Sequence, residues 1–233
     1  LGYAIRQSNL HALAALRTNW LYVVPHDSYL DRFAAHWSWV RHSLGQTAST
    51  SSDAWVALRR ATDEYWADED TADEAGVDWA GRPVVHDLER WVHQLEQAPG
   101  CHGRRGSEVH VGELAPENGT AREGRRTDAG AGQPHLCFAV DDDFLAPAEG
   151  ADVEVLVTYV DRGRGSFVLT VPGEGGRLRS PEVSLHDTGR RRTVRFDVTG
   201  GRLDASLPGG ADLRLTRVRG ADVDVQMVRV VKP

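Results

Sequence analysis

The apolar positions of the chain follow two different periods, one in each part of the sequence. In the first 97 residues, apolar side chains return at three- and four-residue steps, as the buried stripe of an amphipathic helix requires. The pattern predicts four helices, over about 3–17, 28–45, 53–66 and 86–97. Between the first two, the short apolar run Thr18–Val24 is closed by Pro25 and predicts a buried strand.

Beyond residue 106 the apolar period changes to two, which is typical of strands with one buried face. The alternation is clearest over 153–159, 193–198, 212–215 and 223–226, and glycine-rich turns lie at 162–165, 173–176, 200–201 and 209–210. This spacing predicts a β-sandwich of roughly eight or nine strands. Most aromatic side chains of this part fall on the inward period, namely Phe138, Tyr159, Phe167 and Phe196.

The two periods predict an α+β chain with two parts. A mainly helical segment, 1–98, contains all seven tryptophans; a linker over 99–106 follows, and an all-β sandwich occupies 107–233. The lone strand near Trp20 needs sister strands that this sequence does not contain. Because residue 1 is Leu and the only methionine is Met227, we expect the chain to be a fragment of a longer protein.

Composition narrows the classes of function. The hydrophobic fraction of 40% and the charged fraction of 26% are those of an ordinary globular protein. The net charge of −7 lies mostly in the first 97 residues, so the sandwich is close to neutral and offers no large field for polyanions. We therefore expect no nucleic-acid partner, and no apolar run approaches the roughly 18 residues of a membrane helix.

Two cysteines, Cys101 and Cys137, leave two alternatives open. They can close one loop as a disulfide, or remain as two buried free thiols, and the second alternative is the one we expect. Their spacing matches no metal site.

The order of parts resembles the C-terminal region of a bacterial glycoside hydrolase. The strand Asn19-Trp20-Leu21-Tyr22 before a Trp-rich helix resembles the last turn of a (β/α)8 barrel, and the sandwich resembles a jelly-roll accessory domain of the carbohydrate-binding-module type. The matching stretches of the sandwich are 121–127, 137–145, 155–161, 165–169 and 225–230. The resemblance implies a missing N-terminal catalytic barrel, so no catalytic residue is assigned here. It alone favours a secreted or periplasmic location.

The resemblance also places four candidate glycan-binding residues. Trp20 and Tyr22 lie on the barrel strand and His26 just past it, at the rim where such barrels bind substrate. Trp20 can equally fill the barrel core, since large aromatics dominate core burial. The predicted sandwich, 107–233, contains no tryptophan. Phe144 is its one aromatic residue expected in an exposed loop.

Three consecutive carboxylates, Asp141, Asp142 and Asp143, suit a structural calcium ion, because hard oxygen ligands are what calcium prefers. Solvated turn acids are the alternative. Arg122, Arg125 and Arg126 can pair with these acids, bind an anionic substituent, or form surface salt links. No cofactor is required.

These observations favour an accessory region of a carbohydrate-active enzyme, in which the sandwich braces the catalytic barrel and contacts glycan. The alternative is a structural or protein-interaction module without sugar affinity. An enzyme complete in itself ranks last, because no acid–base pair converges in the sequence.

Overall fold

The structure is a computed structural model, and it describes residues 46–58, 88–105, 109–110, 121–122, 124–145 and 150–232. The helices predicted at 3–17 and 28–45 and the strand at 18–24 lie outside these residues, as does the barrel end that they suggested. Within the described residues, no helix is long and apolar enough to cross a membrane.

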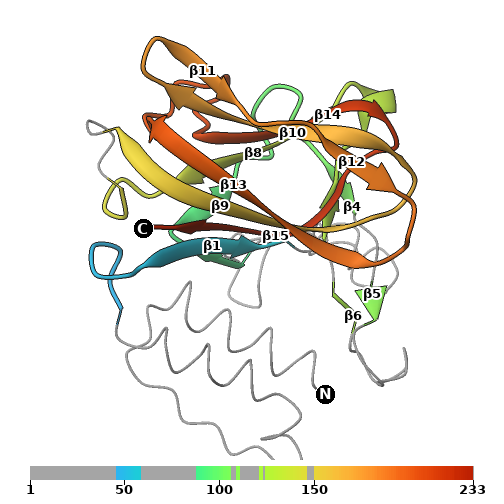
Figure 1. The fold of residues 1–233 in the computed structure, drawn as a ribbon, viewed down its shortest axis with the longest axis horizontal. Helices are drawn as coiled ribbons and strands as arrows, with labels where there is room; N and C mark the ends of the chain where they lie inside the picture. Colours follow the sequence, from blue (N-terminus) through green and yellow to red (C-terminus); the bar gives the residue numbers. More distant parts are fainter. Residues whose placement is uncertain are drawn as a thin grey trace, which may run out of the picture.

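The described chain is built almost entirely of strands, and all of their pairings are antiparallel (Figure 1). The strands are β1 Asp53–Ala57, β2 Leu88–Arg90, β3 Val92–Gln94, β4 Arg104–Arg105, β5 Val109–His110, β6 Ala121–Arg122, β7 Arg125–Arg126, β8 His135–Val140, β9 Ala151–Val160, β10 Arg164–Gly173, β11 Gly176–Arg179, β12 Val183–His186, β13 Arg191–Gly201, β14 Leu213–Gly220 and β15 Asp224–Val231. One short 3-10 helix, Ala129–Ala131, precedes β8.

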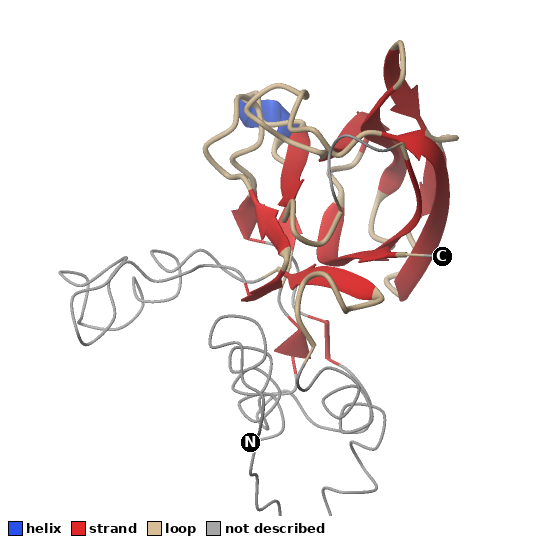
Figure 2. Ribbon diagram, turned by 90° about the vertical axis from the view of Figure 1, so that its left-hand side faces the viewer, coloured by secondary structure: helices blue, strands red, loops and turns tan. Residues whose placement is uncertain are grey.

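The strands form two layers, which confirms the predicted sandwich (Figures 1 and 2). One layer has the order β2-β1-β15-β9-β13, and the other has β10-β14-β8-β3 with β11 and β12 on the free edge of β10. The layers join where Gly173 of β10 pairs with Gly201 of β13. The chain also crosses between them at Trp91, which separates β2 from β3.

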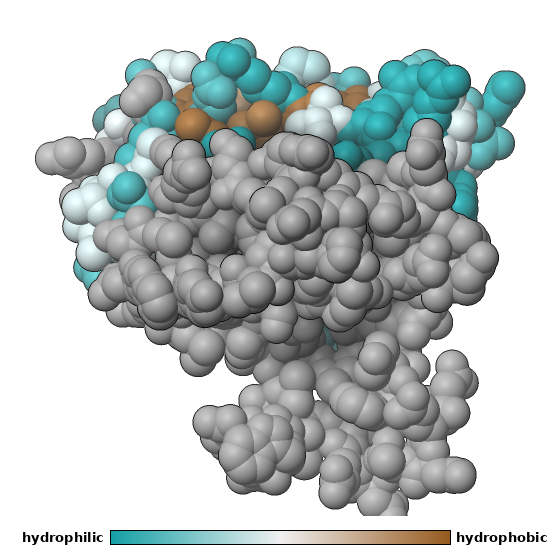
Figure 3. Space-filling view, turned by 90° about the horizontal axis from the view of Figure 1, so that it is seen from below, coloured by the Kyte–Doolittle hydropathy of each residue, from teal (hydrophilic) through white to brown (hydrophobic). Residues whose placement is uncertain are grey.

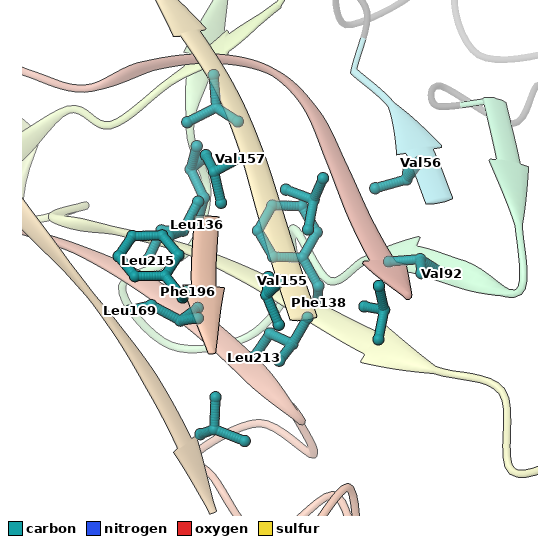
Figure 4. Close-up of a cluster of buried hydrophobic side chains, with 14 of the residues drawn as sticks. Val56, Val92, Leu136, Phe138, Val155, Val157, Leu169, Phe196, Leu213 and Leu215 are labelled. Atoms are coloured by element: carbon teal, nitrogen blue, oxygen red, sulfur yellow. The ribbon is translucent and has the colours of Figure 1, made fainter. Parts of the chain in front are cut away.

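The core lies between the layers, and alternation decides which side chains enter it. Val155 and Val157 of β9 point inward and meet Leu136, Leu169 and Leu215 of the opposite layer (Figure 4). The inward aromatics are confirmed, since Phe138, Tyr159, Phe167 and Phe196 are all at most 6% exposed. Each large apolar side chain buried in this way contributes about 1.5–3 kcal/mol to folding.

The outer side of the first layer is mixed in character. Leu156, Met227 and Val231 are partly exposed there. Charged side chains lie among them, with Arg229 paired to Asp53 and Arg195 paired to Glu154. Figure 3 shows apolar and hydrophilic surface side by side on the part of the molecule that is not drawn in grey. Every charge named here has an opposite charge beside it.

Two helix predictions are wrong. Residues 53–57, expected in a helix over 53–66, form β1, where Ala54 and Val56 alternate into the core and pair with β15. Residues 88–94, expected in a helix over 86–97, form β2 and β3. Trp91 between them has a φ of 60°, which an α-helix does not allow. Tertiary strand pairing outweighs the three- and four-residue spacing in both places.

These three strands precede the predicted linker over 99–106, yet they pair within the sandwich. β1 pairs with β15. β3 pairs with β8, with Val92 opposite Val140 and Gln94 opposite Phe138. Described parts on both sides of that linker therefore share one sheet system.

Cys101 and Cys137 form a disulfide, so the expectation of two free thiols is wrong. Their Cα atoms are 5.6 Å apart, because Cys137 lies on β8 and the loop after β3 returns alongside that strand. The bond lies in a second small core with Ala98, Leu207 and Ala211. It closes a loop with a sequence separation of 36, which stabilises the fold by about 4 kcal/mol in the chain-entropy account.

Candidate functional site

The predicted site residues of the sandwich gather at one place. Phe144 and Asp141–Asp143 lie in the loop after β8, which packs against Trp91. We use the name Trp91 corner for Arg90, Trp91, Phe144, Lys232 and the loop 141–145. Trp20, Tyr22 and His26 lie outside the described residues, so their roles stay predictions.

The corner exists because the chain changes layers there. β2 ends at Arg90 in one layer, and β3 begins at Val92 in the other. Trp91 spans the step with its left-handed backbone, and its carbonyl accepts a hydrogen bond of 2.9 Å from the Asp141 N–H. This bond fixes the acidic loop against the tryptophan.

Four side chains stack at the corner, with a cation at each end. The Arg90 guanidinium carbon lies 4.4 Å from the centre of the Trp91 ring. The Trp91 and Phe144 rings are nearly parallel, at 10° and 6.3 Å between centres. The Lys232 ammonium lies 4.2 Å from the centre of the Phe144 ring. Aromatic contacts and cation–π contacts therefore hold the indole in one orientation.

Phe144 is not the exposed platform that the sequence suggested. It is only 2% exposed, because its ring packs on Trp91 and joins the main core. Trp91 is the partly exposed aromatic side chain of this corner. The sequence pattern placed Trp91 on the apolar stripe of a helix. No feature of the neighbouring residues predicts that this tryptophan has a positive φ.

The two cations of the stack are partly removed from water. Burial lowers the pKa of Arg90, and the nearby charge of Asp53 opposes that shift. Burial also lowers the pKa of Lys232. The Arg90 side chain is almost fully buried, and its Nε and Nη1 atoms have no hydrogen-bond partner. The ring contact with Trp91 is thus a main interaction of this guanidinium.

The three acids of the loop have different surroundings. Asp141 accepts the Asp143 N–H on its Oδ1 atom at 2.9 Å and the Phe144 N–H on its backbone carbonyl, so it shapes the turn. The side chains of Asp142 and Asp143 are exposed. In the part of the chain that the structure describes, no group of three or more acidic, histidine or cysteine side chains could hold a metal ion. Calcium binding here stays a prediction.

Arg125, one of the arginines predicted to pair with these acids, has other partners. Arg125 is 1% exposed and pairs with Glu96 at 2.7 Å, while its Nη2 donates to the Gly103 carbonyl. This ion pair is largely buried and is not a surface link.

Comparisons with known proteins add little. No protein-family model matches the chain, and no curated protein matches it. Solved structures similar over 60% of the chain include the CBM1 of BiXyn10A in its apo form and the C-terminal CBM6 of LamC, a marine laminarinase from Zobellia galactanivorans. Their identities are 13% and 12%, the TM-score is 0.27 for both, and 97% and 99% of those chains are covered. A likeness this low carries no inference about function.

Proposed function

We propose that the chain is an accessory region of a carbohydrate-active enzyme and that its sandwich binds a neutral glycan at the Trp91 corner. The observation on which the proposal rests is a partly exposed indole, held still by Arg90 and Phe144, beside the exposed carboxylates of Asp142 and Asp143. A sugar ring has an apolar C–H side and a polar rim. Because Arg90 and Phe144 stack on the two faces of the indole, its exposed edge is what packs on the apolar side. The carboxylates accept hydrogen bonds from hydroxyls on the polar rim.

The rigidity of the corner favours binding. The Trp91 indole is held between the Arg90 guanidinium and the Phe144 ring, and the Trp91 backbone carbonyl accepts a hydrogen bond from the Asp141 N–H. A side chain that is already ordered loses little entropy when a ligand settles on it. The acidic loop is tied to the same residue, so the hydroxyl acceptors and the indole keep their relative positions.

The test measures retention of the full chain in gels that contain barley β-glucan, xylan or dextran. We expect retention by at least one of them, weakened about tenfold or more by Trp91→Ala, since a stacking tryptophan commonly contributes well over 1 kcal/mol to a small interface. Asp142→Asn combined with Asp143→Asn should weaken binding less. The matched control is Asp197→Asn, an exposed acid on β13.

Trp91 also contacts the core, so Trp91→Ala can disturb folding. Trp91→Phe keeps an aromatic ring, and the paired Asp142 and Asp143 variant leaves the core untouched. If all three variants melt like the parent chain and bind glycan equally well, the Trp91 corner is not the site. If the parent chain binds none of the glycans, the proposal fails as a whole.

A bracing role is the second candidate, and one observation favours it. Asp53 and Trp55 point to the outer side of β1, yet both are 0% exposed. The outer side of this strand is therefore not a free surface, which suits a structural role. This role would be supported if the chain binds none of the glycans and Trp55→Ala lowers the melting temperature sharply.

A further inference from the structure

Three arginines gather on the outer side of the second layer, and within the described residues none of them forms an ion pair. Arg179 of β11 and Arg214 of β14 both pair with Thr170 of β10, one from each side. Residues that share such a row point to the same face of a sheet. Arg177 lies two residues before Arg179, opposite Pro172, so it points to that face as well. We call Arg177, Arg179 and Arg214 the arginine row.

The arginines of the row are close enough to repel one another. Their strands are neighbours or next neighbours, which places the backbones within about 10 Å. Burial and the charge of Arg177 both lower the pKa of Arg214. Burial and the charge of Arg214 lower the pKa of His135, whose Nδ1 atom lies 3.0 Å from the Thr216 hydroxyl. Positive charge is thus concentrated on one face.

The surrounding acids neutralise this face only in part, since the charges of both Arg219 and Arg179 lower the pKa of Glu182. Glu182 forms an ion pair with Arg219, and Glu174 lies on the turn between β10 and β11. Asp212 is 2% exposed and accepts the backbone N–H groups of Val140 and Ala205. Among the described residues, none of the three arginines makes an ion pair, and the Arg214 Nε atom is buried without a hydrogen-bond partner.

The other layer gives the contrast. There Arg229 pairs with Asp53, and Arg195 pairs with both Glu154 and Asp197, each at 2.7 Å. Opposite charges are therefore paired on the outer face of the first layer, whereas the second layer has the Arg219–Glu182 pair and, beside it, three arginines without an ion pair. Like charges side by side on a sheet destabilise it, so this arrangement is better suited to binding an anion than to folding.

We propose that the arginine row binds an acidic polysaccharide through its carboxylate or sulfate groups, an inference that rests on the proposed glycan function for its choice of partner. Guanidinium groups bind such anions in a fork geometry. The Thr216 hydroxyl and the His135 imidazole can contact sugar hydroxyls beside the charges. A nucleic acid fits less well, because its sites combine basic residues with aromatic platforms. The described outward residues of β8, β10 and β14 include no phenylalanine, tyrosine or tryptophan.

The disulfide lies at one end of this face. Arg214 of β14 pairs with Cys137 of β8. The small core around Ala98 and Leu207 covers the outer side of Cys137. That core and the loop joined through Cys101 close the face on the β8 side. A linear polysaccharide is thus expected to follow the β10–β11 side, where Arg177 and Arg179 are exposed.

The test uses the full chain and polygalacturonate, a linear polyuronate, in affinity gels and in titration calorimetry at low and physiological salt. We expect binding that weakens with salt, and a loss of about tenfold on combining Arg177→Gln with Arg214→Gln, since each exposed charge contact contributes up to about 1 kcal/mol. The matched control is Arg195→Gln, an ion-paired arginine of the opposite face, which should change the affinity less than twofold.

Three results would overturn the inference. The parent chain fails to bind polygalacturonate at low salt, the double arginine variant binds as well as the parent, or a thymidine 30-mer binds as tightly as polygalacturonate. The last result would indicate unspecific attraction of polyanions. Failure of the neutral-glycan site is separate, because Trp91→Ala should weaken binding to neutral glycan and leave polygalacturonate binding intact.

Discussion

Single buried polar residues hold the loops of this sandwich together, and Asp161 is the clearest example. Its carboxylate is inaccessible to solvent and accepts the His186 N–H and the Thr188 hydroxyl, both at 2.6 Å. Arg192 lies 3.0 Å from the same carboxylate. One side chain thus joins the end of β9, the end of β12 and the start of β13.

The surroundings of Asp161 predict how stability depends on pH. Burial alone raises the pKa of its carboxyl group, but the hydrogen bonds from Thr188 and His186 and the charge of Arg192 outweigh it, and the net pKa is lowered. The ionised form is therefore favoured by folding. Its contribution is complete above the unfolded value of about 3.9 and is lost as the pH falls through the folded value.

We expect Asp161→Asn to destabilise the chain by about 2–3 kcal/mol at pH 7, because two short bonds to a charged group are weakened or lost. The variant should also lose part of the steep fall in stability below about pH 4. Urea unfolding at several pH values measures both effects. Asp197→Asn, at an exposed acid, should stay within about 0.5 kcal/mol of the parent, and an equal effect of both substitutions would contradict this role for Asp161.

At the level of elements, long strands were predictable and short ones were not. β9, β13, β14 and β15 are each at least 8 residues long, and a period of two shows in part of each of them. β2 and β3 have 3 residues each, too few for any period, and their spacing happens to match a helix. Trp91 and the arginine row were missed for a related reason, because both depend on which distant strands become neighbours.

The disulfide is also an element-level feature, since it ties the loop after β3 to β8. We expect Cys101→Ala combined with Cys137→Ala to lower stability by about 4 kcal/mol, and the amides of 95–103 to lose protection from hydrogen exchange before the β9–β13 pair does. Reductant should reproduce the effect in the parent chain and have none in the double variant. Unchanged melting after verified reduction would show that the small core around Ala98 holds this loop without the bond.

For the whole molecule, the distribution of charge matters more than its sum. The sandwich is nearly neutral, and on that ground the sequence suggests no attraction for polyanions. The fold nevertheless distributes the charges unevenly, with ion pairs on the outer face of one layer and, on the other, the arginine row beside a single Arg219–Glu182 pair. A total taken over a sequence cannot reveal this distribution, because register decides which side chains share a face.

This distribution predicts that two similar substitutions have opposite effects on stability. Arg177→Gln removes a like-charge neighbour of Arg214, so the melting temperature should rise by about 2 °C in 10 mM salt, where the Debye length is about 30 Å. Arg195→Gln removes the partner of Glu154 and Asp197, so the melting temperature should fall by a similar amount. In 1 M salt, where the Debye length is about 3 Å, both differences should vanish. If Arg177→Gln destabilises the chain at low salt, its charge has a partner within the fold, and the arginine row is not an unneutralised surface.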